Sequence, residues 1–321
     1  MKGFWKDYPE IYGEIEAVKE IIEKNAKCKD KIIENSITEL LGSGGKMLRP
    51  GFTILASKFG EYNEERTRAL ASVVEMFHMA TLVHDDVIDD AELRRGKETV
   101  QSKYGKNYAV YIGDYLFCLC FKTLAMTKNL NRDVTVDTKV MSRICLGEVE
   151  QLNSRYKRDI TIKEYLKRVS GKTAELFSLS LYIGAVESNL DNKTSRIFWE
   201  IGHNIGMAFQ IIDDILDLVG EKHKTGKLIG NDLREGIYTL PVLLALKDDR
   251  KEMESILREE YSDDEIKSVT EYLEKEKYIE KSFDIANKYS EKAIRNIRML
   301  PSNTYREILL EITEKMLQRK N

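Results

Sequence analysis

Residues 195–219 read SRIFWEIGHNIGMAFQIIDDILDLV, and this stretch decides the fold class. Its apolar residues recur every three or four positions, as one face of an α-helix requires. These residues are Ile201, Ile205, Phe209, Ile212, Ile215 and Leu216. A helix would also carry Gln210 and three aspartates as one polar stripe, because they stand at i, i+3, i+4 and i+7. The aspartates are Asp213, Asp214 and Asp217, so the stretch predicts a long helix that ends in acid.

A second long helical pattern runs from about residue 64 to residue 90 and also ends in acid. It closes on HDDVIDD, residues 84–90, where Asp85 and Asp89 lie one helical turn apart and Asp86 flanks them. Carboxylates crowded on one turn repel each other, so they cost stability unless cations or water surround them. Oxygen ligands without His or Cys suit magnesium. The motif favours a magnesium site, with a solvated acidic helix end as the alternative.

The composition favours helices throughout and one continuous domain. Only four prolines interrupt the 321 residues, and the long stretches between them are rich in Leu, Ile, Glu, Lys and Ala. No linker, low-complexity tract or short repeat divides the chain. We therefore expect an all-α protein with a single domain over residues 1–321.

Charge and cysteine content argue against a nucleic-acid partner, a disulfide framework and a structural zinc site. The 51 basic and 54 acidic residues leave a net charge of −3, so no nucleic-acid surface is expected. The four cysteines form no C-x-x-C pair, which argues against a disulfide framework or a structural zinc site and favours a cytoplasmic protein. No run approaches the roughly 18 apolar residues of a membrane-spanning helix, so we expect at most peripheral membrane contact.

Basic residues form short groups that are suited to an anionic ligand. Lys46 and Arg49 stand in GGKMLRP, residues 44–50, where a helix begins and its dipole favours anions. Arginine suits bidentate contact with phosphate oxygens, whereas lysine supplies a point charge. Each group alone is also typical of a solvated surface. The other candidates are Arg94 and Arg95 on an expected loop, Lys172, and Lys227.

Seven blocks in a fixed order then carry a specific resemblance. They are GGKMLRP (44–50), HDDVIDDAELRRG (84–96), GDYLF (113–117), GEVEQ (147–151), KT (172–173), FQIIDDILD (209–217) and DLREGIYTLP (232–241). Over nearly its whole length the chain resembles the trans-isoprenyl diphosphate synthase (polyprenyl synthetase) family. Around the first aspartate motif it is most similar to catalytic subunits of heptaprenyl and other long-chain prenyl diphosphate synthases.

The resemblance implies long antiparallel helices around a deep central cavity, and an enzyme that condenses isopentenyl diphosphate with an allylic diphosphate. It implies three magnesium ions held by six aspartates, which are Asp85, Asp86, Asp89, Asp213, Asp214 and Asp217. It places the isopentenyl diphosphate on Lys46, Arg49, His78 and Arg95. It places the allylic diphosphate on Arg94, Lys172 and Lys227. The residues that it implies in catalysis are Lys172, Thr173, Gln210, Asp85 and Asp213.

One block departs from the family pattern. Many members read G-K-x-T-L-P where this chain reads GIYTLP at residues 236–241. A lysine often credited with diphosphate binding is therefore replaced by Ile237, while Lys227 remains. A subunit that acts only with a partner thus stays an alternative to an enzyme that is active alone.

Product length depends on the side chains below the first aspartates, because the growing tail must run along that helix. Thr81 and Phe77 lie roughly 6 and 12 Å below Asp85 on one stripe. At Ala80 and Thr81, where short-chain family members carry aromatics, small side chains leave the tunnel open. Phe77 could close it one level deeper. We predict a hexaprenyl to octaprenyl product, with a farnesyl or geranylgeranyl product as the alternative.

Two further enzyme classes share parts of the pattern. A class I terpene cyclase has the first motif but usually an Asn/Ser/Glu-type second motif, unlike residues 213–217. A metal phosphohydrolase of the HD type would use His84 and Asp85, with His78 as a further ligand, but it needs more histidines than the four present.

The family implies a homodimer, or a heterodimer with a small regulatory subunit. The apolar block at residues 108–125 is core or subunit interface, with core favoured.

Overall fold

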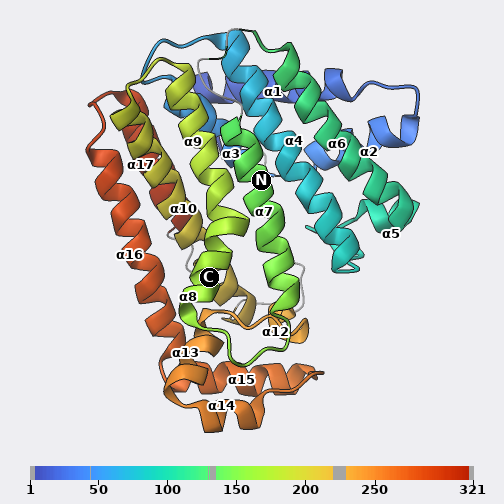
Figure 1. Cartoon of the computed structure of the whole chain (residues 1–321), viewed down its shortest axis with the longest axis vertical. Coiled ribbons are helices and arrows are strands. Elements are labelled where there is room, and N and C mark those ends of the chain that lie inside the picture. The colour runs from blue at the N-terminus through green and yellow to red at the C-terminus, as the bar shows by residue number, and fades with distance from the viewer. Residues whose placement is uncertain (1–3, 44, 129, 131–134, 220–228, 318–321) are drawn as a thin grey trace. The chain divides into compact units, whose positions relative to one another are not determined.

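The chain is all-α, as the sequence predicts. The computed structural model describes residues 4–43, 45–128, 130, 135–219 and 229–317. A single two-stranded hairpin interrupts the helices of these residues (Figure 1). In chain order, the elements as far as α6 are α1 (Pro9–Ala26), α2 (Lys31–Leu41), α3 (Leu48–Ser57), α4 (Glu64–Ile88), β1 (Leu93–Arg94), β2 (Lys97–Glu98), α5 (Val100–Tyr104) and α6 (Lys106–Met126).

The remaining elements are also helical. They are α7 (Thr135–Asn153), α8 (Ile162–Val169), the π-helical turn η1 (Ser170–Ala174), α9 (Glu175–Glu187), α10 (Asn192–Val219), α12 (Asn231–Arg234), α13 (Leu240–Asp248), α14 (Arg250–Ile256), α15 (Asp263–Lys275), α16 (Tyr278–Arg298) and α17 (Thr304–Leu317). The two long helices predicted from the acidic stretches are therefore α4 and α10, each within three residues of its expected bounds.

The chain divides into two compact units. The first unit contains residues 1–133 and 180–198, and the second contains residues 134–179 and 199–321. Two of the boundaries fall inside the continuous helices α9 and α10. A single domain over residues 1–321 stays a prediction.

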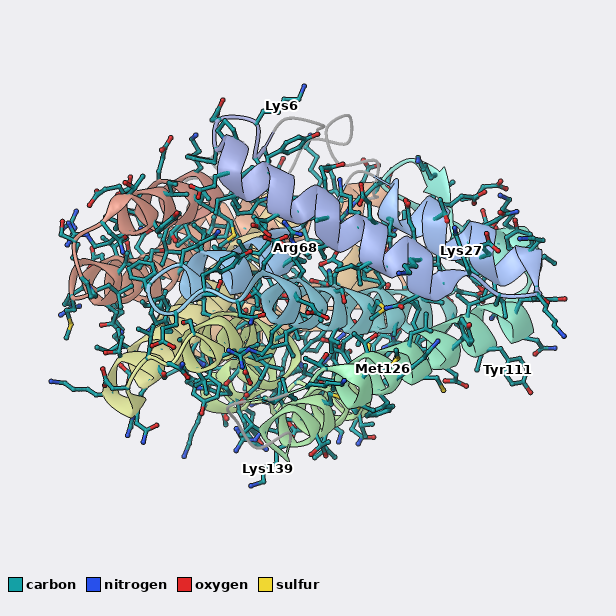
Figure 2. The ribbon with its side chains drawn as sticks, turned by 90° about the horizontal axis from the view of Figure 1, so that it is seen from above. Lys6, Lys27, Arg68, Tyr111, Met126 and Lys139 are labelled. Atoms are coloured by element: carbon teal, nitrogen blue, oxygen red, sulfur yellow. The ribbon has the colours of Figure 1, made fainter. Side chains whose placement is uncertain are left out.

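In the first unit, α4 lies between α1 and α6 and packs along both (Figures 1 and 2). Nearly every apolar side chain in the middle of α4 is buried, as a helix covered on several sides requires. Asn63 caps its first turn by accepting a hydrogen bond from the Arg66 backbone N–H at 2.9 Å. Across the helix, Arg68 Nε donates to Glu14 Oε2 of α1 at 2.7 Å. The position of α4 is thus fixed by apolar packing and by a largely buried ion pair.

By length and composition alone, α6 could cross a membrane. One of its faces, however, is buried in the first unit, with Ile112 and Leu116 fully enclosed. The opposite face carries the exposed charged residues Lys106, Asp114 and Lys122. Because a core helix of a globular unit has this same composition, we interpret α6 as a packed helix.

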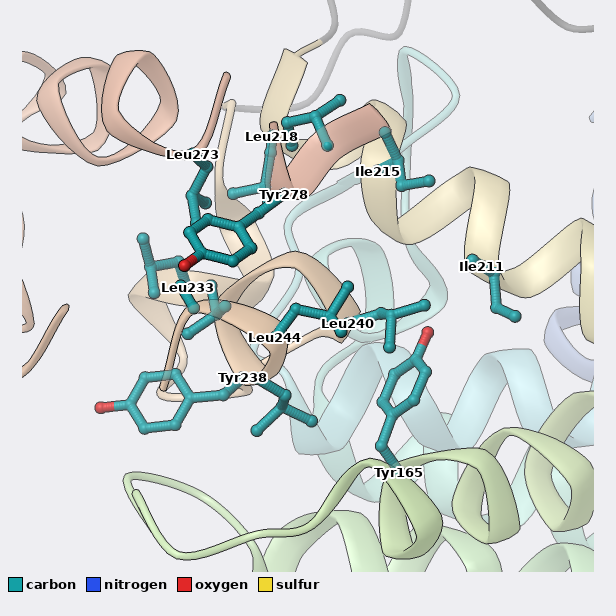
Figure 3. Close-up of a cluster of buried hydrophobic side chains, with 14 of the residues drawn as sticks. Tyr165, Ile211, Ile215, Leu218, Leu233, Tyr238, Leu240, Leu244, Leu273 and Tyr278 are labelled. Carbon is teal, nitrogen blue, oxygen red and sulfur yellow. The ribbon is translucent and has the colours of Figure 1, made fainter. Parts of the chain in front are cut away.

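In the second unit, α13 forms the centre of an apolar cluster. Residues 240–246 read LPVLLAL, and all seven are buried. Side chains of α8, α10, α15 and α16 surround them (Figure 3). α8 and α15 begin with capping boxes, which satisfy the first backbone N–H groups of each helix. The cluster therefore fixes α10, which carries the second aspartate motif, against α8 and α13.

Candidate active site

The first aspartate motif lies at the C-terminal end of α4. Asp86 is buried, and its Oδ1 accepts a hydrogen bond from Arg94 Nε at 2.7 Å. Arg94 reaches back because β1 and β2 form a tight hairpin whose two turn residues, Arg95 and Gly96, both have positive φ. Arg94, predicted to bind a diphosphate, is thus placed directly beside a predicted metal ligand.

A contact with α6 fixes the turn that carries this motif. Within the GDYLF block, Gly113 faces the His84 ring so closely that a Cβ there would stand 2.3 Å from His84 Nε2. The same nitrogen lies 3.1 Å from the Val110 carbonyl oxygen and 3.4 Å from Asp114 Oδ1. A side chain at position 113 would displace His84, so the glycine permits the close approach of the two helices. Neither Gly113 nor Asp114 was predicted from the sequence to have a role.

Three of the four residues predicted to hold isopentenyl diphosphate interact electrostatically in the first unit. Burial and the positive charges of Arg49, Arg95 and Arg94 lower the pKa of His78 well below its usual 6.5. The imidazole is therefore neutral at pH 7. Arg95 Nη1 lies beside Gly45, 3.1 Å from where a Cβ would stand.

An acid, Glu75, also interacts with these arginines, and Lys46 stands just before α3 in the same unit. Burial raises the pKa of Glu75, one turn before His78, and the charges of Arg49 and Arg95 partly oppose the rise. Lys46, the fourth predicted residue, precedes α3; its carbonyl oxygen accepts a hydrogen bond from Trp5 Nε1 at 2.6 Å. Glu75, a buried acid that interacts with these arginines, was not predicted from the sequence.

The chain-length candidates lie on the face of α4 that meets α6. Phe77 and Ala80 are buried, and the Thr81 hydroxyl donates to the His78 carbonyl oxygen at 2.9 Å. The Phe77 ring contacts Phe117 of α6 with ring centroids 5.3 Å apart. Phe77 thus belongs to an aromatic pair, and its partner was not predicted.

The second aspartate motif is held by a chain of hydrogen bonds in the second unit. The Thr173 hydroxyl donates to Gln210 Oε1 at 2.6 Å, and Gln210 Nε2 donates to Asp214 Oδ1 at 2.7 Å. The hydroxyl of Tyr165, a fully buried residue of α8, donates to Asp214 Oδ2 at 2.6 Å. In Figure 3 this hydroxyl points toward the α10 segment that carries Ile211. Both oxygens of Asp214 are therefore oriented by protein donors.

Burial makes Asp214 an unusual carboxyl group. Desolvation raises its pKa to about 6, and the neighbouring Asp213 adds to the rise. Hydrogen bonds from Tyr165 and Gln210 and the charge of Arg168 oppose the rise. A cation bound here would stabilise the ionised form, so the donor set fits a hard divalent ion.

The turn that carries Lys172 and Thr173 is π-helical, a form that often occurs at functional sites. The turn lies close to α10 because Gly206 has no side chain: a Cβ there would stand 2.5 Å from Ala174 Cα. Lys172 Nζ donates to Glu148 Oε2 of α7 at 2.7 Å. Glu148, in the GEVEQ block, was not assigned a role from the sequence.

Asp217 accepts hydrogen bonds from two backbone N–H groups of residues 230–232. The Asp232 N–H donates to Asp217 Oδ2 at 3.1 Å, and the Gly230 N–H donates to the Asp217 carbonyl oxygen at 2.7 Å. The predicted diphosphate ligand Lys227 lies outside the described residues.

A small cavity in the second unit gathers most of the predicted residues there. Its lining includes the predicted residues Lys172, Thr173, Gln210 and Asp214. Tyr165, Arg168 and Ile237 also line it. The cavity therefore combines hydroxyl, amide, carboxylate and cationic groups around the second motif.

The predicted metal ligands are not gathered into a preformed cage in the described part of the chain. No three His, Cys, Asp or Glu side chains there converge in a way that would hold a metal ion. Asp85, Asp86 and Asp89 belong to the first unit, and the other three aspartates belong to the second. The sharing of metal ions by the two motifs stays a prediction.

Comparison with known proteins agrees with the resemblance seen in the sequence. Residues 30–274 match the family model described as polyprenyl synthetase. The chain belongs to the polyprenyl synthetase family. Heptaprenyl diphosphate synthase component 2 of Geobacillus stearothermophilus is 38% identical over 307 residues, which cover 95% of each chain.

Solved structures of this family share the fold. The chain superposes on geranylgeranyl pyrophosphate synthase from Lactobacillus brevis with a TM-score of 0.93 and 33% identity, covering 99% of this chain and 100% of that one. A polyprenyl synthase from Caulobacter crescentus, complexed with calcium and isoprenyl diphosphate, gives a TM-score of 0.88 and 32% identity, covering 97% and 96%. Synthases named for different product lengths thus have this fold.

Proposed function

We propose that this polyprenyl synthetase is a trans-prenyltransferase that condenses isopentenyl diphosphate with an allylic diphosphate. The product is an all-trans polyprenyl diphosphate of medium to long chain length. The observation that carries the proposal is the grouping of Lys172, Thr173, Gln210 and Asp214 around one cavity. These are residues that the family resemblance assigns to the allylic substrate, its carbocation or the metals.

At the allylic end, the second unit supplies a lysine and fixed dipoles. Lys172 would exchange its hydrogen bond with Glu148 for a diphosphate oxygen. Thr173 and Gln210 are held by each other and by Asp214, so their oxygens cannot reorient freely toward solvent. Fixed oxygen dipoles stabilise a developing carbocation without the cost of reorganisation. The Phe209 ring, 5.6 Å from Phe177, offers a π-face for the same purpose.

At the isopentenyl end, the first unit supplies two arginines and a neutral histidine. Arg49 and Arg95 suit the oxygens of a diphosphate. His78 stays neutral beside them, so its one N–H would donate a hydrogen bond to the diphosphate without adding repulsion to the arginine pair. Held in this way, the double bond of isopentenyl diphosphate would stay within reach of the carbocation. The allylic C–O bond would break to give this carbocation and free diphosphate, and the double bond would add to the carbocation to form the new C–C bond. The released diphosphate would then accept the proton that the condensed cation loses.

Six aspartates would hold the metal, and we infer three Mg²⁺ ions for each active site. When bound, such ions act as Lewis acids that neutralise the leaving diphosphate. The buried position and raised pKa of Asp214 support the assignment in the second unit. The ion pair of Asp86 with Arg94 supports a shared role in the first, because the same guanidinium can turn to a diphosphate.

We favour a hexaprenyl to octaprenyl product. The 38% identity to a heptaprenyl diphosphate synthase component supports this length, as does the small Ala80 on α4. The paired rings of Phe77 and Phe117 would form the far wall of the tunnel. A geranylgeranyl product remains the alternative, because a synthase of that name shares the fold.

We further propose that the protein is a cytoplasmic homodimer, with α6 as contact surface. The block at residues 108–125 is buried on one side, as a core helix would be. On its other side Tyr111 is 71% exposed, Phe121 53%, and Met126 at the helix end 70%. Tyr111 and Met126 are labelled on this helix in Figure 2. A second copy of the chain would cover these side chains. A small partner subunit is the alternative, since the Geobacillus relative is named as one component of a synthase.

Incubation of the purified chain with labelled isopentenyl diphosphate, Mg²⁺ and a series of allylic primers tests the proposal. We expect an elongated prenyl diphosphate, seen as a longer alcohol after phosphatase treatment, and a mass of two chains by light scattering. A hydrocarbon product would instead identify a terpene cyclase. No product from the pure chain, with activity restored by a second protein, would identify a dependent subunit.

A further inference from the structure

Arg168 of α8 is a buried positive charge that the reaction described above does not use. Its side chain is 6% exposed. Its hydrogen bonds within the described residues go to uncharged oxygens: Nη1 donates to Ser154 Oγ at 2.6 Å and Nη2 to the Tyr238 carbonyl oxygen at 3.3 Å. The guanidinium carbon lies 5.6 Å from the Tyr165 ring centroid. A buried guanidinium without a bonded carboxylate is costly unless another negative charge approaches it.

The cavity beside Arg168 is lined by two carboxylates, Asp214 and Asp232, and it is the place where a further negative charge could enter. Arg168 lines the cavity that also contains Lys172 and Asp214. Ile237 lines the same cavity and is buried. This is the position where many family members carry a lysine.

We propose that Arg168 is a binding residue for the allylic diphosphate, and that it supplies the positive charge which the lysine at position 237 supplies in other members. The inference rests on the proposed function, because it assumes that a diphosphate occupies this cavity. The guanidinium is already desolvated, so its attraction to a phosphate oxygen is little screened by water. Its two terminal nitrogens keep donor capacity beyond the bonds to Ser154 and Tyr238.

A purely structural role predicts different behaviour. In that case Arg168 would only join the end of α7, through Ser154, to the segment before α13, through Tyr238. Ser154→Ala removes this link and keeps the charge, whereas Arg168→Met removes both. Ile237→Lys in the Arg168→Met background restores a charge to the cavity and leaves the link broken.

The test measures the Kd of inorganic diphosphate by calorimetry with excess Mg²⁺, and the KM of the allylic substrate, on folded variants. Arg168→Met should weaken diphosphate binding about tenfold and raise the allylic KM similarly, with little change in the KM of isopentenyl diphosphate. Adding Ile237→Lys should recover most of the loss. Ser154→Ala should lower the melting temperature but leave the Kd within about twofold.

An unchanged Kd in Arg168→Met, or a loss that Ile237→Lys does not reduce, would overturn the inference. If Arg168→Met does not fold, Arg168→Gln replaces it; that variant also removes the charge, so the same loss is expected and an unchanged Kd again overturns the inference. A wild-type chain that neither binds diphosphate nor condenses substrates would refute the proposed function. A wild-type chain that does both, while Arg168→Met matches it, refutes only the role of Arg168.

Discussion

Replacing Tyr165 by phenylalanine removes one oxygen atom from the support of the second aspartate motif. The ring of Tyr165 is fully buried, and Phe fills the same space, so packing is preserved. The lost contact is the 2.6 Å hydrogen bond to Asp214 Oδ2. Gln210 continues to donate to the other oxygen. The variant therefore isolates the contribution of one donor to one carboxylate.

The expected loss depends on pH because Asp214 has a pKa of about 6. At pH 8 the carboxylate is ionised, and a buried hydrogen bond to a charged group contributes about 1.5–3 kcal/mol to the free energy of unfolding. Near pH 5 the carboxyl group of the folded protein is protonated, so the loss should fall to about 1 kcal/mol. Partners of this kind also tune metal affinity, so the half-saturating Mg²⁺ concentration should rise by about tenfold or more.

Urea denaturation at both pH values and Mg²⁺ titration of activity provide the measurements. Tyr272→Phe is a matched control, because its hydroxyl donates to Asp249 Oδ2 at 3.0 Å on an exposed surface. That variant should lose at most about 1 kcal/mol and keep its Mg²⁺ requirement. If the two variants lost equal stability at pH 8, or if the Tyr165→Phe loss were the same at both pH values, the hydroxyl would have no special role toward the ionised carboxylate.

Three further variants and one control variant test the first unit. Gly113→Ala places a Cβ 2.3 Å from His84 Nε2, so urea denaturation should show a loss of about 1–3 kcal/mol, whereas Gly13→Ala, which meets open space in α1, should cost nothing. The folded protein keeps His78 neutral, whereas the unfolded chain protonates it below pH 6.5. Because the unfolded chain then binds more protons, the free energy of unfolding is highest above pH 6.5 and falls as the pH falls. His78→Gln should therefore flatten the pH dependence of unfolding in that acidic window; an unchanged slope would contradict a neutral His78. Ala80→Phe should shorten the product, as read by chromatography of the alcohols, and an unchanged product spectrum would refute the tunnel assignment.

The sequence predicted the helices that carry chemistry better than the contacts that orient them. α4 and α10 were predicted because their apolar residues recur at helical spacing and their ends are marked by aspartates. Tyr165 was not predicted, although it stands seven residues before Lys172. A spacing of seven implies one helix face only if the helix is regular, and the π-helical turn begins at residue 170 and includes Lys172.

Other contacts depend on packing that no local pattern encodes. The role of Gly113 follows from the distance between α4 and α6, and that of Glu148 from the placement of α7 beside the π-helical turn. The GDYLF and GEVEQ blocks did mark both positions in the sequence. Their contacts could be identified only once the neighbouring helices were known.

The π-helical turn at residues 170–174 also constrains how this region can change. A π-helical turn holds one residue more than an α-helical turn, so deletion of one residue would convert it to regular helix. Everything after that point would then rotate by about 100° relative to α8. Either the apolar side chains of α9 or the face of α8 that carries Tyr165 would then lose its packing contacts. Insertions and deletions should therefore be rare between Tyr165 and the end of α9, even where single substitutions are accepted.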